Sequence, residues 1–291
     1  MTTLTNKIDF MVTIDVENAN PNGDPLGGNT PRMTADGLGL ISDVAIKRKI
    51  RNRLQDICQN DEGYRIFVQA NDRSDDGAKS LEERFNNIIT EDVDLNDFKD
   101  TVNKTWLDVR SFGHVFTFAP KTVKDKGKKV SKLAIGVRGP VSISPATSVE
   151  TLPVTAMQIT RSTNSEDKGN DRDSSTMGMK YFVDHATYVI KGSISPNLAE
   201  TTGFSQEDAK LIKEALRTLF ENDQSAARPD GSMTVRDVYW FEHSNKLGNV
   251  SSARVYKLLS YNPETKAFDL DTEKLDAYKD KGLSLDIIEG F

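Results

Sequence analysis

Residues 8–57 constrain the fold most, because they predict a strand, a loop and a basic helix in immediate succession. Apolar residues at every second position from Ile8 to Val16 have the period of a strand with one buried face. The segment Asn20-Pro21-Asn22-Gly23-Asp24-Pro25 follows, and this density of proline, glycine and asparagine predicts a loop. A strand and loop that lead into a basic helix favour a nucleic-acid ligand over a small substrate.

The segment 41–58 predicts an amphipathic helix with a strongly cationic polar side. Its buried stripe, at helical spacing, is expected to comprise Ile46, Ile50, Leu54 and Ile57. Ser42 is expected to cap the first turn. Lys47 and Arg51 are four positions apart and therefore share a face beside this stripe. Two cations one turn apart can contact successive phosphates, which adds salt-dependent affinity.

The net charge of −6 argues against nucleic acid only until its distribution is considered. Residues 71–100 hold ten acidic and four basic side chains, whereas 41–55 hold one acidic and five basic ones. Residues 121–138 hold seven basic and one acidic side chain. A nucleic-acid footprint is local, so a segregated acidic protein can bind phosphates. Solvated charged surfaces are the alternative explanation of the same pattern.

The rest of the chain predicts an α+β domain. A second amphipathic helix is expected at 205–220, and the further strands are expected at 64–70, 133–143, 182–194, 235–241 and 255–259. This order fits a ferredoxin-like βαββαβ core, an antiparallel sheet with helices on one face. The other face is expected to be free for a ligand, as in modules that stack single-stranded RNA on a sheet.

We expect residues 1–291 to form a single domain with three insertions. Residues 71–104 are acidic, with one short helix expected around Phe85. Residues 119–132 are rich in lysine. Residues 160–180 are expected to form a projecting loop that is almost wholly polar over 161–178. A connection as long as the last one is often functional.

Four blocks resemble a known family. They are the loop and basic helix from Asn20 to Arg51, Asp108-Val109-Arg110-Ser111-Phe112-Gly113, Gly136-Val137-Arg138-Gly139-Pro140-Val141, and Gln158-Ile159-Thr160-Arg161-Ser162. Their order over residues 8–260 resembles the backbone subunit of type I-C CRISPR Cascade complexes, the Cas-seven family, Csd-two group, of the RAMP superfamily.

The resemblance implies a modified RNA-recognition-type (RRM-like) palm with a finger insertion and a thumb loop. Copies of such a subunit stack helically along one CRISPR RNA, and each thumb kinks the guide. The guide then pairs with target DNA in antiviral defence, so that base pairing reads sequence and protein reads backbone. The implied partners are the CRISPR RNA, target DNA, further copies of the chain, and the guide-processing, large and small subunits.

The expected RNA-binding residues combine both lines of reasoning: Arg32, Ser42, Lys47, Arg51, Arg138, Arg161, Met177, Met179 and Lys180. Capping alone also explains Ser42. Met177 or Met179 is expected to wedge between guide bases, an action that needs an apolar side chain on a polar loop. The alternative is that both methionines enter the core. Arg110 is expected to be structural, paired with a carboxylate such as Asp108.

The resemblance implies that this subunit is not catalytic. No metal is expected, since the three histidines lack a paired ligand spacing, and no cofactor is expected, since no phosphate-cradling glycine loop of Walker type occurs. The alternative is a metal-dependent RAMP ribonuclease that uses Asp24 or Asp36; a structural protein without nucleic acid is a third reading. The lone cysteine, Cys58, and the lack of an apolar signal sequence in residues 1–7 favour a cytoplasmic protein.

Overall fold

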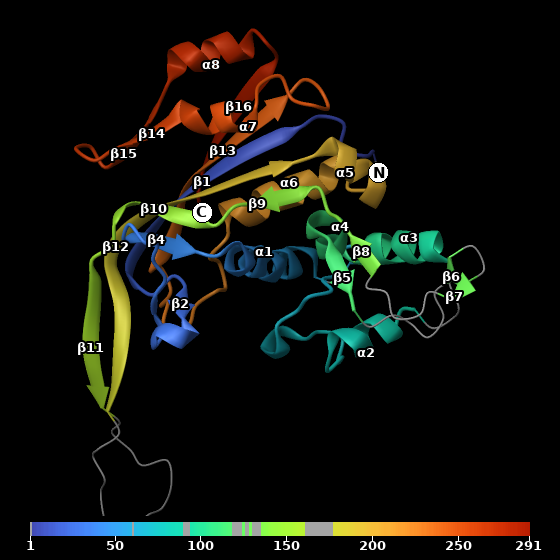
Figure 1. The fold of residues 1–291 in the computed structure, drawn as a ribbon, viewed down its shortest axis with the longest axis horizontal. Coiled ribbons are helices and arrows are strands. Elements are labelled where there is room, and N and C mark those ends of the chain that lie inside the picture. The colour runs from blue at the N-terminus through green and yellow to red at the C-terminus, as the bar shows by residue number, and fades with distance from the viewer. Residues whose placement is uncertain are drawn as a thin grey trace, which may run out of the picture.

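A long antiparallel sheet forms the centre of the computed structural model (Figure 1). The structure describes residues 2–59, 61–89, 94–117, 135–160 and 177–291, and the backbone of 124–125 and 128–129. The sheet path is β16-β13-β1-β12-β10-β4, and β9 and β11 also pair with β12. The bounds are β1 Ile8–Ala19, β4 Leu38–Ile41, β9 Val141–Ile143, β10 Ala146–Thr151, β11 Val154–Thr160, β12 Met177–Ile194, β13 Met233–His243 and β16 Leu283–Glu289.

The topology confirms the predicted ferredoxin-like core. Helix α1 (Asp43–Cys58) follows β1, and α5 (Pro196–Thr202) and α6 (Gln206–Arg217) connect β12 to β13. The order across the sheet is β13, β1, β12 and then the strands that precede β12 in the chain. Every pairing among these strands is antiparallel. A βαββαβ chain whose last strand pairs with its first has this arrangement.

The main core lies between the sheet and helices α1 and α6. Asp9, Met11 and Thr13 of β1 are buried as well as the alternate residues from Ile8 to Val16, so the prediction of a single buried face was wrong. The alternate residues line the main core. They pack with Ile46, Ile50 and Leu54 of α1 and with Ile212 and Leu216 of α6. The local sequence explains α6, because Ser205 and Asp208 form a capping box at its first turn.

The opposite face of the sheet is not free, which corrects the prediction for it. Met11, Tyr239 and Phe241 project from that face into a second apolar cluster with Val255 and Leu275. The covering elements follow β13 in the chain: α7 (Ser252–Val255), η3 (Tyr256–Leu258), β14 (Leu259–Asn262), β15 (Ala267–Leu270) and α8 (Thr272–Lys279). Large apolar side chains on both sheet faces require two covers, because leaving them in water costs free energy.

The acidic segment 71–104 helps to form a third apolar cluster. It contributes two helices, α2 (Leu81–Asn86) and α3 (Leu95–Thr105), where the sequence predicted one short helix. Five aromatic rings pack in this cluster at centroid distances of 4.5–6.5 Å, mostly tilted or edge to face: Phe67, Phe85, Phe98, Trp106 and Phe116. The neighbouring elements are α4 (Leu107–Phe112), β5 (His114–Phe116) and β8 (Ile135–Val137).

Three strand predictions were wrong in detail. The segment 64–70 makes only an isolated bridge, between Arg65 and Trp106. The segment 133–143 divides into β8 and β9 around Arg138–Pro140, where a bulge or bend was expected. The segment 255–259 is helical over most of its length and becomes a strand only at Leu259.

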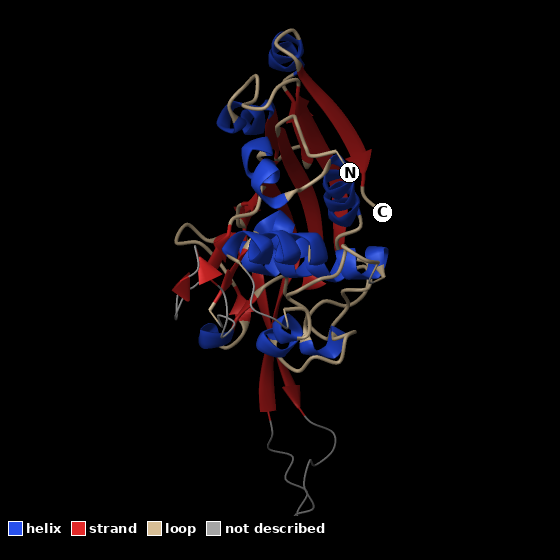
Figure 2. Cartoon of the chain, turned by 90° about the vertical axis from the view of Figure 1, so that its right-hand side faces the viewer, coloured by secondary structure: helices blue, strands red, loops and turns tan. Residues whose placement is uncertain are grey.

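A two-stranded ribbon of β11 and the first part of β12 projects from the body (Figures 1 and 2). The remaining elements are short: β2 (Gly23–Asp24), η1 (Pro25–Gly27), β3 (Thr30–Pro31), η2 (Asn71–Arg73), β6 (Lys124–Asp125) and β7 (Lys128–Lys129). Among the helices of the described ranges, none has the length and apolar character needed to cross a bilayer.

Candidate nucleic-acid interface

Asn22 joins the loop after β1 to the start of α1. Its side-chain oxygen accepts the Ser42 N–H at 3.0 Å, and its carbonyl accepts the Arg32 N–H at 3.0 Å. The Ser42 hydroxyl in turn accepts the Ala45 N–H at 3.3 Å, which is the predicted cap. Two of the predicted RNA-binding residues, Arg32 and Ser42, therefore flank a single asparagine.

Lys47 and Arg51 lie one turn apart on the same side of α1, and Arg51 contacts α4. The Lys47 ammonium lies 3.0 Å from Asp43, one turn earlier. The Arg51 guanidinium lies 2.8 Å from Asp108 and 5.1 Å from the Phe112 ring centroid, and its side chain is only 13% exposed. Lys47 thus remains partly open to solvent, whereas Arg51 also ties α1 to α4.

The neighbouring cations of α1, Arg48, Lys49 and Arg53, all contact groups of other segments. Lys49 is buried and paired with Asp223. Arg48 donates to the Val68 carbonyl at 2.8 Å, and Arg53 donates to the Thr218 hydroxyl at 2.7 Å. All three are drawn inward because the segments 66–76 and 218–223 pack alongside the helix.

Asp24 and Asp36, the carboxylates of the nuclease alternative, lie in different turns. Asp24 accepts the Leu26 N–H at 3.2 Å and lies 3.5 Å from the Arg32 guanidinium. Asp36 is exposed. Within the described part of the chain, no three His, Cys, Asp or Glu side chains group in a way that would hold a metal ion.

Arg110 is structural, as predicted, but its partner is Asp208 and not Asp108. Its Nε and Nη2 donate to the two oxygens of Asp208 at 3.0 and 2.8 Å, and both side chains are buried. The predicted RNA-binding Arg138 is exposed beside Gly139. A Cβ at Gly139 would lie 2.3 Å from the Ser111 carbonyl, so this close approach requires glycine.

The projecting ribbon carries Met177, Met179 and Lys180, whereas Arg161 lies outside the described residues. Both methionines begin β12 but do not enter the core: Met177 is 64% exposed and Met179 is 50% exposed. Across from them, Met157 and Ile159 of β11 are 45% and 47% exposed. Met157 pairs with Lys180 and not with Met179, and paired residues point to the same face of a ribbon. Met157 and Ile159 therefore lie on the face opposite to Met177 and Met179.

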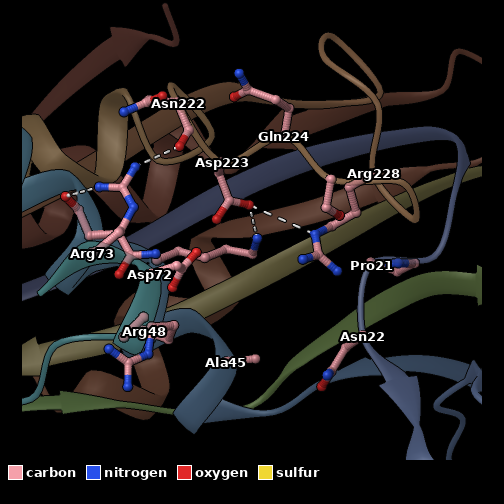
Figure 3. Close-up of a pocket in the computed structure, with 14 residues that line it drawn as sticks. Pro21, Asn22, Ala45, Arg48, Asp72, Arg73, Asn222, Asp223, Gln224 and Arg228 are labelled. Carbon is pink, nitrogen blue, oxygen red and sulfur yellow. Dashed lines mark hydrogen bonds and ion pairs between the residues drawn. The ribbon is translucent and has the colours of Figure 1, made fainter. Parts of the chain in front are cut away.

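A cavity that the sequence did not reveal lies on the other side of α1 (Figure 3). Arg73 and Arg228 lie in two separate loops beside it, and Arg48 and Lys49 extend from the helix. Arg73 belongs to an acidic segment and Arg228 to a short loop, so neither stands out in sequence. Only the packing of both loops beside α1 brings these cations together.

Comparisons with known proteins identify the family. A family model described as CRISPR-associated protein Cas7 matches residues 6–286. A Haloferax volcanii protein named CRISPR-associated protein Cas7 is 30% identical over 225 residues, which cover 73% of this chain and 63% of the relative. The matched part thus spans less than two thirds of that relative.

Two solved structures are similar to this chain at lower sequence identity. One chain, from a CRISPR RNA-guided surveillance complex in a pre-nicking state, has a TM-score of 0.49 and 15% identity, with 81% of this chain and 78% of the other covered. Another, from a CRISPR RNA-guided surveillance complex, has a TM-score of 0.45 and 17% identity, with 81% and 68% covered. The assignment therefore rests on the sequence matches, and by these the chain belongs to the CRISPR-associated Cas7 protein family.

Proposed function

We propose that this protein is the repeated backbone subunit of a type I-C CRISPR surveillance complex, the Cascade. Several copies bind side by side along one CRISPR RNA in the cytoplasm. The guide, held by its phosphates, pairs with target DNA. Family membership over residues 6–286 is the observation that carries this proposal, and the four sequence blocks carry the subtype.

The cationic side of α1 supports a role in phosphate binding. Lys47 is partly exposed, and its only recorded partner within the described residues is Asp43 of the same helix. A surface pair of this kind contributes little to stability, so its replacement by a phosphate contact costs little. Lys47 is thus the first guide ligand to test, with Arg32 and Ser42 beside the N-terminus of the helix.

The ribbon supports the proposed thumb. Exposed apolar side chains on a projecting ribbon are disfavoured in water unless a partner covers them. In the proposed assembly that partner is the guide and the neighbouring copy, and Met177 or Met179 is the wedge between bases. Lys180, adjacent to Met179, and Arg161, which follows the residue paired with Met177, are proposed as guide contacts. Arg138 is proposed as a further guide contact because it is exposed within the third sequence block.

In this proposal the subunit is not catalytic, and its other partners are the guide-processing, large and small subunits. The decisive experiment is to purify the protein with and without a CRISPR array transcript. Native mass and the ratio of absorbance at 260 to 280 nm are then compared. A large ribonucleoprotein that forms only with the transcript is expected. A nucleic-acid-free monomer in both preparations would contradict the proposal.

Lys47→Glu tests the phosphate contact within the same experiment. We expect less RNA per protein, because a carboxylate at this site repels phosphate. Lys279→Glu is the matched control, since Lys279 also pairs with a carboxylate of its own helix, Asp276, on the distant helix α8. Equal RNA loading of both variants would remove Lys47 from the interface without affecting the assignment to the family.

A further inference from the structure

A cavity of about 760 Å³ lies between α1 and three loops (Figure 3). Beside the helix, its walls are the turn η2, the loop 222–228 after α6, and the loop that contains Pro21 and Asn22. Eleven of the fourteen lining residues are polar or charged. The volume is within the range of small-molecule sites, about 300–1,000 Å³, and the polar lining favours a polar ligand.

Cations outnumber carboxylates in the lining. The carboxylates are Asp72 and Asp223, and the cations are Arg48, Lys49, Arg73 and Arg228. Asp223 is already occupied, because Lys49 pairs with it and the Arg228 Nε lies 3.8 Å away. Arg73 pairs with Asp56, which lies outside the lining, so Arg48 and Arg228 carry the remaining positive charge against Asp72. This smaller excess still favours an anion in the cavity.

Arg228 is the cation of the lining with the weakest pairing inside the described part of the chain. Its Nε is buried and has no hydrogen-bond partner among the described residues. The distance of 3.8 Å to Asp223 is too long for a hydrogen bond. The side chain as a whole is 28% exposed, so the terminal nitrogens of its guanidinium, and not the enclosed Nε, are the donors that an anion in the cavity could reach.

Arg48 is also short of negative charge. It donates to a neutral acceptor, the Val68 carbonyl, and the ion pairs of the described residues do not include it. Burial lowers the pKa of its guanidinium and the neighbouring Arg51 lowers it further, whereas Asp108 and Asp72 offset only part of this fall. An anion in the cavity would offset both effects. The amides of Asn22, Asn52 and Gln224 add hydrogen-bonding capacity for the remaining polar atoms of such a ligand.

We propose that this cavity binds the phosphate group of a nucleotide, with Arg228 and Arg48 as its main cationic ligands. The phosphate comes either from an RNA backbone or from a free nucleotide. The site is separate from the Lys47 side of α1, since Arg51 on that side contacts α4. The backbone form of this proposal rests on the proposed function, whereas the free-nucleotide form does not.

Arg228→Gln removes the charge and is expected to leave the fold intact. The Asp223 carboxylate keeps Lys49 as a partner, and the main-chain hydrogen bonds between Ser225 and Arg228 do not need the side chain. Arg228→Lys keeps the charge without the guanidinium. Arg254→Gln is the matched control, because Arg254 is an exposed arginine of α7 outside the cavity.

The test measures affinity for a short single-stranded RNA and, separately, for uridine monophosphate at several salt concentrations. We expect Arg228→Gln to weaken RNA binding about tenfold, as for the loss of one charged hydrogen bond. The slope of log affinity against log salt should fall by about 0.7, the value for one phosphate contact on a single strand. Arg228→Lys should restore this slope, and Arg254→Gln should change neither quantity.

The outcomes separate the two sources and the two proposals. A loss for RNA alone assigns the site to a backbone phosphate, and a loss for both ligands assigns it to a single nucleotide. Unchanged binding of both ligands by a folded Arg228→Gln protein overturns the inference, even if Lys47→Glu is defective. If the unmodified protein binds the nucleotide but not RNA, the proposed guide-binding function is contradicted and the phosphate site in the cavity is supported. If it binds neither ligand, both the proposed function and the phosphate site are contradicted.

Discussion

The Arg51 Nε lies 2.8 Å from Oδ2 of Asp108, and this contact joins α1 to α4. The same carboxylate accepts the N–H groups of Phe67 and Val68 at 2.7 and 3.1 Å. The Asp108 side chain is 1% exposed, and both of its carboxylate oxygens accept hydrogen bonds from other residues. One carboxylate thus holds together the helix with the proposed guide contacts, α4 and the segment before η2.

The first prediction is that Asp108→Asn lowers the free energy of unfolding by about 2–4 kcal/mol, near the cost of breaking a buried ion pair. An asparagine also presents an NH2 group toward at least one donor. Chemical denaturation with urea measures the difference. Asp276→Asn is the control, because its pair with Lys279 is exposed and should contribute little. Equal stability of the two variants would contradict the role given to Asp108.

This pair also affects how RNA-binding variants are interpreted. Arg51→Glu would place a second carboxylate against Asp108 in a nearly buried site, where like charges repel strongly. A loss of RNA binding in that variant would combine unfolding with the loss of a phosphate contact. Lys47 is therefore the better position for a charge reversal, because its only recorded ion pair among the described residues is with a partly exposed carboxylate.

A second prediction concerns the bidentate pair of Arg110 and Asp208, which links α4 to the capping box of α6. Lysine keeps the charge but cannot donate two parallel hydrogen bonds. We expect Arg110→Lys to destabilise the protein by about 1–3 kcal/mol, the cost of an unsatisfied buried acceptor. Thermal or urea unfolding measures this loss.

The chain offers a matched control for that substitution. Arg217 makes a similar bidentate pair with Glu214, at 3.0 and 2.9 Å, but both side chains are partly exposed. Arg217→Lys should therefore cost far less than Arg110→Lys, since water can replace a lost contact at the surface. Comparable losses at the two sites would show that burial does not determine the cost here.

The thiol of Cys58 provides a third prediction. Burial, followed by the nearby Asp61, raises the pKa of this thiol to about 11. The thiolate is the reactive form, so alkylation by iodoacetamide at pH 8.5 should be much slower in the folded protein than in urea. Because the chain has one cysteine, mass spectrometry after timed quenching reports on this site alone. Equal rates in both states would contradict the burial of the thiol.

The same shift predicts a pH dependence of stability. Between the unfolded pKa of 9.0 and the folded value of about 11, the unfolded chain loses its thiol proton first. The unfolded state then binds fewer protons, so stability falls as the pH rises through this interval. In Cys58→Ala this contribution should be absent, and its stability should decrease less between pH 9 and pH 11. A parallel decrease in both proteins would assign the effect to other groups.

Local patterns predicted the elements that local chemistry determines. Helix α6 has its own capping box, and the buried stripe of α1 follows from apolar spacing alone. The partner of Arg110 was wrong because Asp208 is 98 positions away, whereas Asp108 is close in sequence. The residues that cover the second sheet face were missed for a similar reason. In the sequence Met11 is only one of the intervening residues of a strand. In the fold it packs with Tyr239 and Leu275, which are more than 220 positions away.

The candidate site shows the same limit. A cationic helix was predicted from composition and spacing, but the side on which each cation lies depends on neighbours distant in sequence. Arg51 turns toward Asp108, and Lys49 turns toward Asp223, 174 positions later. Neither choice follows from helical periodicity, which places residues on faces but does not identify what those faces contact.

The ribbon provides the last prediction. Changing Met177 and Met179 together to glutamine should leave the melting temperature of the free protein unchanged, because both side chains are largely exposed. The same substitution at Met11, which is 2% exposed, should lower the melting temperature, because it puts an amide into the apolar cluster on the covered sheet face. If the ribbon inserts an apolar side chain against the guide, the double variant should form less of the large particle with a CRISPR array transcript. Full assembly of that variant would exclude both methionines as the wedge, since glutamine retains their length but not their apolar surface.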